Sequence, residues 1–150
     1  MSSTYKYRFG NILVIREQEK KESEMAYKEA VRNFEEIATK LYDLLKKKED
    51  LLSFQQERLS IGASIDEIHH YARFIDSLEK TIADVQQKVI QARAKMNWHE
   101  SKLLEKNLEV RKFEKMREKD FEAYQKEQIR LETIQLDELS SLAYNKREIR

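Results

Sequence analysis

Residues 59–67 have the sequence LSIGASIDE, which combines a helix stop, a short turn and a helix start. Gly62 can adopt the positive φ of a helix C-cap, a conformation that a Cβ disfavours. Ser64 and Glu67 have the spacing of a capping box, and Asp66 adds negative charge near the positive end of the next helix. A turn this short predicts that the second helix runs back antiparallel along the first.

The sequence after this turn carries a stripe of mostly apolar residues at alternating steps of three and four. It persists over roughly six heptads, which is typical of a coiled coil rather than of a single amphipathic surface helix. The stripe consists of Ile68, Tyr71, Ile75, Leu78, Ile82, Val85, Val89, Ala92, Met96, His99, Leu103, Lys106, Val110 and Phe113. Past Phe113 it becomes less regular. A lone polar residue in such a stripe, here His99, more often fixes register than binds a metal.

The sequence before the turn repeats the pattern. Its stripe consists of Tyr27, Val31, Phe34, Ala38, Leu41, Leu45, Lys48, Leu52, Gln55 and Leu59. In the same register, the positions nearer the N-terminus are Leu13, Glu17, Lys20 and Glu24. The seam between the helices is therefore expected to be polar and weak between Glu17 and Glu24.

These patterns predict an all-α fold in which two long helices form an antiparallel coiled-coil hairpin. The expected helices span about residues 11–60 and about residues 65–142, with a turn at about 61–64 and a frayed tail at about 143–150. We expect one coiled-coil domain over residues 1–150. If residue i of the first helix lies opposite about residue 124 − i, the second helix has no partner past about residue 115.

Composition supports an elongated, soluble protein. The 150 residues include no Pro, no Cys and two Gly, and 38% of them are charged, against about 25% in a typical globular domain. The net charge of +1 provides no field that would attract nucleic acid or an anionic membrane. The absence of Cys fits a reducing compartment, and no apolar run approaches the roughly 18 residues of a membrane span. We therefore expect a cytoplasmic protein without a secretory signal.

The sequence offers no arrangement for catalysis, so we predict that the protein is not an enzyme and takes no cofactor or small-molecule substrate. Its two glycines lie too far apart to form a phosphate-binding loop. Asp66 and His70 could supply two metal ligands, but a solvated capping turn is the better interpretation, so no metal site is predicted. The basic residues between Arg111 and Lys119 are interleaved with acidic ones, which does not favour nucleic-acid binding.

Several residues fall at heptad position g, beside both stripes, when Val31 and Ile68 are placed at position a. They are Ile37, Leu44 and Leu51 in the first helix and Phe74 and Thr81 in the second. The g edges of an antiparallel pair face each other, so the apolar members are expected to converge on one side near the turn. An exposed apolar patch usually marks a protein interface. We favour that interpretation over a merely widened core stripe.

Three segments of the chain resemble the FliJ family of bacterial flagellar type III export proteins. They are the opening YKYRFGNILVIR at residues 5–16, YARFIDSLEKTI at residues 71–82, and EKNLEVRKFEKMREK at residues 105–119. The similarity extends over nearly the whole chain. The combination of this opening, the turn position and the motif that follows the turn is more specific than any one of them.

The resemblance implies a coiled-coil hairpin similar to the central stalk of rotary ATPases. It implies a non-enzymatic adaptor that links the hexameric flagellar export ATPase to the membrane-embedded export gate and escorts export chaperones of late flagellar substrates. Such a protein is needed for flagellum assembly, motility and chemotaxis. Its expected place is the cytoplasm, associated peripherally with the cytoplasmic face of the cell membrane at the flagellar base, and it is expected to be a monomer.

The resemblance also implies where the gate binds, because in that family gate binding maps to surface residues that flank the turn. The matching residues are Leu44, Leu51, Phe74 and Leu78, with Ile37 and Thr81 as a secondary flank. The chain departs from the family at Lys47, where some relatives carry an aromatic residue. The alternative to an export adaptor is a structural coiled coil, such as a self-associating scaffold or spacer.

Overall fold

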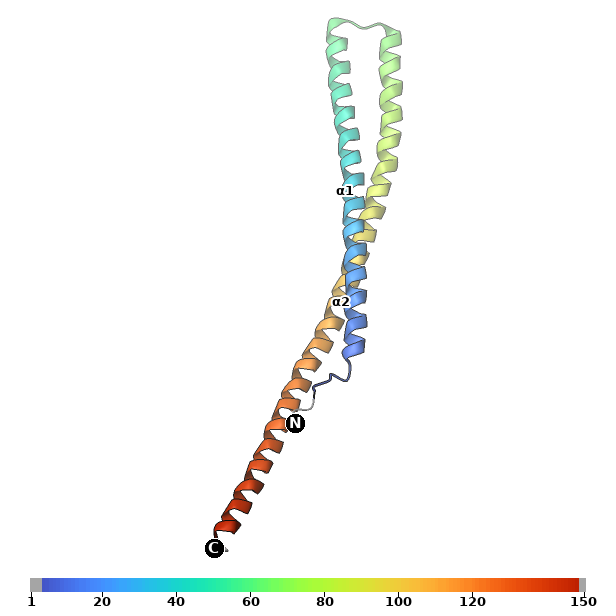
Figure 1. Ribbon diagram of the computed structural model, residues 1–150. Coiled ribbons are helices and arrows are strands. Elements are labelled where there is room, and N and C mark those ends of the chain that lie inside the picture. Colours follow the sequence, from blue (N-terminus) through green and yellow to red (C-terminus); the bar gives the residue numbers. More distant parts are fainter. Residues whose placement is uncertain (1–3, 149–150) are drawn as a thin grey trace. The chain divides into compact units, whose positions relative to one another are not determined.

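The computed structural model describes residues 4–148, which form two α-helices joined by a short turn (Figure 1). Helix α1 is Gly10–Ile61 and helix α2 is Ile65–Glu148. The two helices pack against each other, so the predicted all-α helical hairpin is confirmed. Helix α2 continues to Glu148, beyond the expected end near residue 142, and the last two residues of the expected tail lie outside the described residues.

The turn has the geometry that its sequence predicts. Gly62 has a φ of 107°, and its N–H donates a hydrogen bond to the Arg58 carbonyl oxygen at 3.0 Å. The Ser64 hydroxyl oxygen accepts a hydrogen bond from the Glu67 N–H at 3.2 Å and so caps α2. The Glu67 carboxylate reaches the Arg58 guanidinium at 3.0 Å. This ion pair ties the last turn of α1 to the first turn of α2.

The chain divides into two compact units. One unit is Lys21–Leu104 and contains the turn. The other unit combines Met1–Lys20 with Glu105–Arg150. The single coiled-coil domain expected over residues 1–150 stays a prediction.

In the unit of residues 21–104, α2 contributes the core stripe that the sequence predicts. Its buried members are Ile75, Leu78, Ile82, Val85 and Ala92. All five belong to the predicted stripe, and the side chains between them are exposed except that of Val89, a half-buried member of the same stripe. Removal of this apolar surface from water is the main force that holds the two helices together here.

One half of the α1 seam in this unit also agrees with the prediction. The predicted positions Tyr27, Phe34, Leu41, Lys48 and Gln55 are all half-buried. They repeat every seven residues, and in the register that the structure shows they take heptad position a instead of the position d that follows from placing Val31 at a. The Lys48 ammonium lies 3.3 Å from the Glu79 carboxylate of α2, so this polar member of the seam is paired across it.

Near the turn, the other half of the α1 seam lies one residue earlier than predicted, whereas the predicted Val31 and Ala38 are half-buried beside Ala30 and Ile37. The positions that face α2 are Ala30, Ile37, Leu44, Leu51 and Arg58, which are buried or half-buried. Their predicted counterparts Leu45, Leu52 and Leu59 are 42%, 44% and 50% exposed. The prediction that Ile37, Leu44 and Leu51 lie outside the seam at position g is therefore wrong, because they occupy seam position d.

The ion pair between Arg58 and Glu67 shows which leucine of each adjacent pair in α1 belongs to the seam. Leucine occupies both 44 and 45, and both 51 and 52, so apolar pattern alone does not separate the two registers. Arg58 continues the spacing of Leu44 and Leu51, and its guanidinium bonds to Glu67 of α2. The ion pair between the helices therefore identifies the register that the leucine doublets leave open.

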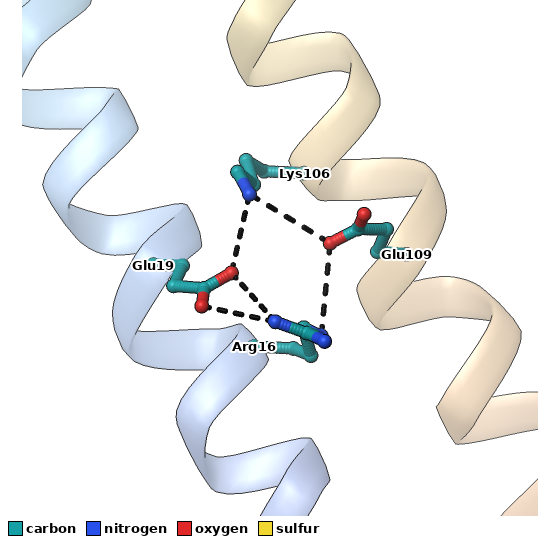
Figure 2. Close-up of polar contacts among 4 residues, drawn as sticks. All are labelled: Arg16, Glu19, Lys106 and Glu109. Carbon is teal, nitrogen blue, oxygen red and sulfur yellow. Dashed lines mark hydrogen bonds and ion pairs between the residues drawn. The ribbon is translucent and has the colours of Figure 1, made fainter.

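In the second unit, four charged side chains form a closed cluster in the seam, beside the buried Leu13 and Val110 (Figure 2). Arg16 Nη1 lies 3.0 Å from Glu19 Oε1, and Lys106 Nζ lies 3.2 Å from Glu19 Oε2. Glu109 Oε2 lies 3.8 Å from Arg16 Nε and 3.9 Å from Lys106 Nζ. The charges alternate in sign around this cluster, so each charged side chain lies next to two side chains of opposite charge.

Acidification is expected to weaken this charged cluster through Glu19. A hydrogen bond from Lys106, with a second from Arg16, holds the pKa of the Glu19 carboxyl below its usual value of 4.5. A carboxyl whose pKa is lower in the folded state stabilises that state above its unfolded pKa and loses this contribution as the pH falls through the folded pKa. Glu19→Gln should therefore melt at a lower temperature than the parent at pH 7, and this difference should shrink below pH 4.5.

Thermal melting followed by circular dichroism at several pH values would check this expectation. Glu118→Gln is the matched control, because Glu118 belongs to the same unit and is exposed. A Glu19→Gln difference that stays constant down to about pH 3 would show that the carboxylate charge does not stabilise the cluster.

The N-terminal segment before α1 packs along α2 through its aromatic side chains. The Tyr5 ring centroid lies 5.0 Å from that of Phe121 and 5.2 Å from that of Tyr124. The Tyr5 hydroxyl donates a hydrogen bond to the Asp120 carboxylate at 2.8 Å. Desolvation, together with this hydrogen bond, raises the pKa of Tyr5 from its usual 10.0 to about 12, so the hydroxyl keeps its proton further into the alkaline range than an ordinary tyrosine does.

This aromatic segment covers part of α2 that was expected to have no partner. The expectation of an unpaired α2 past about residue 115 is wrong for Asp120, Phe121 and Tyr124, which contact Tyr5. Tyr7 adds a hydrogen bond from its hydroxyl to the Phe113 carbonyl oxygen at 3.1 Å. Beyond these contacts, every residue in the range 129–148 is exposed.

Candidate protein-binding edge near the turn

Phe74 is a large aromatic residue that the hairpin leaves on its surface. It lies at the predicted position g of α2, and it is 42% exposed. The Lys47 Nζ atom of α1 lies 5.4 Å from the Phe74 ring centroid, within the range of a cation–π contact. In the observed register, Lys47 is at position g of α1. The g edges of the two helices therefore do meet, as the sequence predicts, but with Lys47 rather than the leucines beside Phe74.

Two further aromatic residues lie on the same side, closer to the turn. Phe54 follows Lys47 by one heptad and is 45% exposed. Its ring centroid lies 5.6 Å from that of Tyr71, with the two rings edge to face. We call Lys47, Phe54, Tyr71 and Phe74 the turn-proximal edge. A shallow hollow beside it is lined by Asp43, Lys46, Lys47, Asp50, Leu51 and Phe54.

The six residues expected to bind the gate occupy different environments. Leu78 is 7% exposed and belongs to the core between the helices. Ile37, Leu44 and Leu51 are half-buried in the α1 seam, whereas Phe74 and Thr81 are exposed. Phe74 and Thr81 thus lie open at the surface. The half-buried Ile37, Leu44 and Leu51 could touch a partner only with the part of each side chain that is exposed at the edge of the seam. Their role in binding stays a prediction.

Sequence reasoning missed Phe54 and Lys47 as members of this surface. Both immediately precede seam residues, Gln55 and Lys48, just as Phe74 immediately precedes Ile75. Position g is assigned to them only after the seam of α1 is placed at Leu44 and Leu51. The signal was present in the sequence, but it depended on the register that the leucine doublets obscured.

A second hollow lies farther from the turn, where two small side chains of α1 face His99 of α2. It is lined by Ala26, Glu29, Ala30, Arg32, Asn33, Glu36, Lys95 and His99. Basic and acidic side chains are mixed around it, so it favours no ligand of one charge. Within residues 4–148, no group of three or more His, Asp or Glu side chains is placed to hold a metal ion.

The exposed aromatic side chains of the turn-proximal edge suit contact with another protein. Aromatic side chains are enriched at protein interfaces, and this edge exposes two of them, Phe54 and Phe74. Neither helix, over the residues described, has a stretch long and apolar enough to cross a membrane.

Comparisons with known proteins match the chain to a protein family and to a solved structure. The family model described as "Flagellar FliJ protein" matches residues 5–148. A flagellar FliJ protein of Bacillus subtilis (strain 168) is 40% identical over 136 residues, which cover 91% of this chain and 92% of the relative. A solved structure described as that of a YscO homolog, CT670 from Chlamydia trachomatis, aligns with a TM-score of 0.72. That alignment covers 98% of this chain and 99% of the other at 19% identity, so it supports the fold alone.

Proposed function

Because the chain belongs to the FliJ family of flagellar proteins, we propose that it is a non-enzymatic component of the flagellar type III export apparatus. The family match over residues 5–148 is the observation that carries this proposal. The resemblance noted in the segments at residues 5–16, 71–82 and 105–119 is confirmed as membership of the family.

Within that apparatus the protein acts as an adaptor. It connects the hexameric export ATPase with the membrane-embedded export gate and escorts the chaperones of late export substrates. It works in the cytoplasm, at the cytoplasmic face of the membrane at the flagellar base. Two surfaces support this role, each in a different unit: the turn-proximal edge, and the exposed part of α2 at residues 129–148.

The gate contact is centred on Phe74. Its ring is exposed, and seam residues on the same helix, Ile75 and Leu78, hold its backbone in place. Placing an anchor residue on a rigid helix limits the conformational entropy lost on binding. Thr81 lies farther along the same g edge. Leu44 and Leu51 are half-buried in the seam next to it, and Leu51 lines the shallow hollow.

The ATPase contact uses the end of α2 and the N-terminal segment. Apolar side chains there are exposed at Leu131, Ile134 and Leu142, with no counterpart from the rest of the described chain to cover them. Helix amides with few buried neighbours open readily, so residues 129–148 should exchange their amide hydrogens fast in the isolated protein. Binding of the export ATPase is expected to slow exchange in this segment and in residues 4–9.

Hydrogen exchange with and without a saturating amount of purified ATPase tests this part of the proposal. Co-purification of the two proteins from cells provides an independent readout. Amides around the buried Ile82 and Val85 are the internal control, since they should exchange slowly in both states. Unchanged exchange at both ends of the chain under saturating ATPase would contradict the ATPase contact.

A second candidate function is a self-associating scaffold, and one observation favours it. Leu45, Leu52 and Leu59 form an exposed row at seven-residue spacing on α1, a pattern that another helix could pack against. Sedimentation equilibrium of the purified chain separates the two candidates. A monomer near the calculated 18.1 kDa supports the adaptor, and a stable dimer supports the scaffold.

A further inference from the structure

We propose that the turn-proximal edge selects a partner segment in which a carboxylate lies next to an apolar side chain, and that Lys47 sets this selectivity. The inference rests on the proposed gate contact and adds the chemistry of the segment that makes it. Its basis is the position of the Lys47 ammonium group, 5.4 Å from the centroid of the exposed Phe74 ring.

A partner that covers the Phe74 ring must also cover the Lys47 ammonium. The two groups come from different helices but meet on one edge, and both residues are exposed. An apolar side chain placed on the ring would therefore take the cation out of water. Phe74 and Lys47 thus form a single recognition element.

Desolvation of this cation determines what the partner must supply. A charge removed from water without an opposite partner costs far more than burial of the ring contributes, so buried charges in proteins are paired. No ion pair joins the Lys47 ammonium to a carboxylate of the described residues, although Asp43 and Asp50 flank Lys47 on the same helix and line the same hollow. The cation–π contact compensates only part of the lost hydration. A carboxylate of the partner segment is the group that completes the site.

The charges around the hollow do not favour an anion by themselves. Asp43 and Asp50 line it together with Lys46 and Lys47, so two acids balance two bases. The selectivity therefore comes from position rather than from net charge. Lys47 is the cation placed over the ring, and a partner carboxylate must approach that nitrogen while its neighbour covers Phe74.

The test measures binding of the purified full-length chain to the cytoplasmic portion of the gate protein at low and high salt. Lys47→Met removes the charge and keeps an unbranched side chain. It should weaken binding about tenfold at low ionic strength, because a charge pair is lost at the interface. Since salt screens charge pairs, the deficit should fall to about twofold in 0.5 M salt. Lys47→Arg keeps a cation able to lie over the ring and should bind within about twofold of the parent.

Lys40→Met is the matched control. Lys40 is exposed at the same position g, one heptad before Lys47, and its replacement changes the net charge equally. It should leave both the affinity and its salt dependence within about twofold of the parent. Unchanged melting temperatures would confirm that all the variants keep the fold.

Two results would overturn the inference. If Lys47→Met binds as tightly as the parent with the same salt dependence, or more tightly, Lys47 does not select a carboxylate, while the gate contact itself stands. If the parent chain does not bind the gate portion at either salt concentration, both the gate contact and this inference fail.

Discussion

Leu78→Ala is expected to lower the free energy of unfolding by about 2–5 kcal/mol, the range for truncation of a buried leucine. Leu78 is 7% exposed and lies in the α2 stripe between two other buried residues, Ile75 and Ile82. A two-helix hairpin has no third element that could move in and fill the space left by the side chain. Denaturant unfolding followed by circular dichroism measures the loss.

Two variants serve as controls for Leu78→Ala. Glu118→Ala alters an exposed residue and should change stability by less than about 0.5 kcal/mol. Leu45→Ala makes the same chemical change as Leu78→Ala at a position that is 42% exposed, so its cost should be clearly smaller. Equal losses for Leu78→Ala and Glu118→Ala would mean that the assigned core stripe is wrong.

Phe74→Ala is expected to weaken binding to the gate protein by about 2 kcal/mol, a roughly thirtyfold loss, while the hairpin stays folded. A few buried aromatic anchors supply most of the energy of a typical interface, and Phe74 is the exposed ring at the centre of the turn-proximal edge. The fold should survive because the seam residues Ile75 and Leu78 remain. In cells we expect poor motility at a normal protein level.

A pulldown on the gate protein, run beside circular dichroism melting, tests this expectation. Tyr42→Ala is the matched control, since Tyr42 is an aromatic residue of α1 that is 63% exposed and lies outside the turn-proximal edge. It should bind like the parent. Phe74→Ala variants that unfold, or that bind the gate as well as the parent does, would show that Phe74 is a packing residue.

The observed register changes what is expected of a second variant. Leu44→Ala/Leu51→Ala would be a surface variant if these leucines lay at position g, outside the seam. They face α2 instead, so the double variant should lower stability as well as any binding. A loss of gate binding by this variant is therefore not evidence for a contact surface unless its melting temperature matches that of the parent.

The sequence predicts α2 better than α1 for a physical reason. In α2 the stripe from Ile68 to Phe113 is flanked mainly by polar residues, so one register buries far more apolar surface than its neighbours. In α1 the doublets Leu44-Leu45 and Leu51-Leu52 make two registers nearly equal in apolar content. The burial of Leu44 and Leu51 in preference to Leu45 and Leu52, and the pairing of Arg58 with Glu67, are seen only in the structure.

The N-terminal segment shows a second limit of periodicity. Tyr5, Tyr7 and Phe9 alternate with basic residues, a pattern that by itself indicates a strand and gives no sign of packing against a helix. Their packing against Phe113, Phe121 and Tyr124 is a long-range contact of aromatic side chains. To predict this contact, one would need to know which part of α2 lies beside the start of α1 at Gly10. Phe74, in contrast, was correctly expected at the surface, because its position depended on the α2 register alone.

If this protein takes part in flagellar protein export, its loss should change the secretion of flagellar proteins. The test is to delete its gene in the bacterium that encodes it and to compare flagellar proteins in the culture medium with those inside the cells. We predict that secretion falls sharply while synthesis of early flagellar components continues, and that the parent gene restores secretion. Secretion that stays at the level of the undeleted strain would contradict the account.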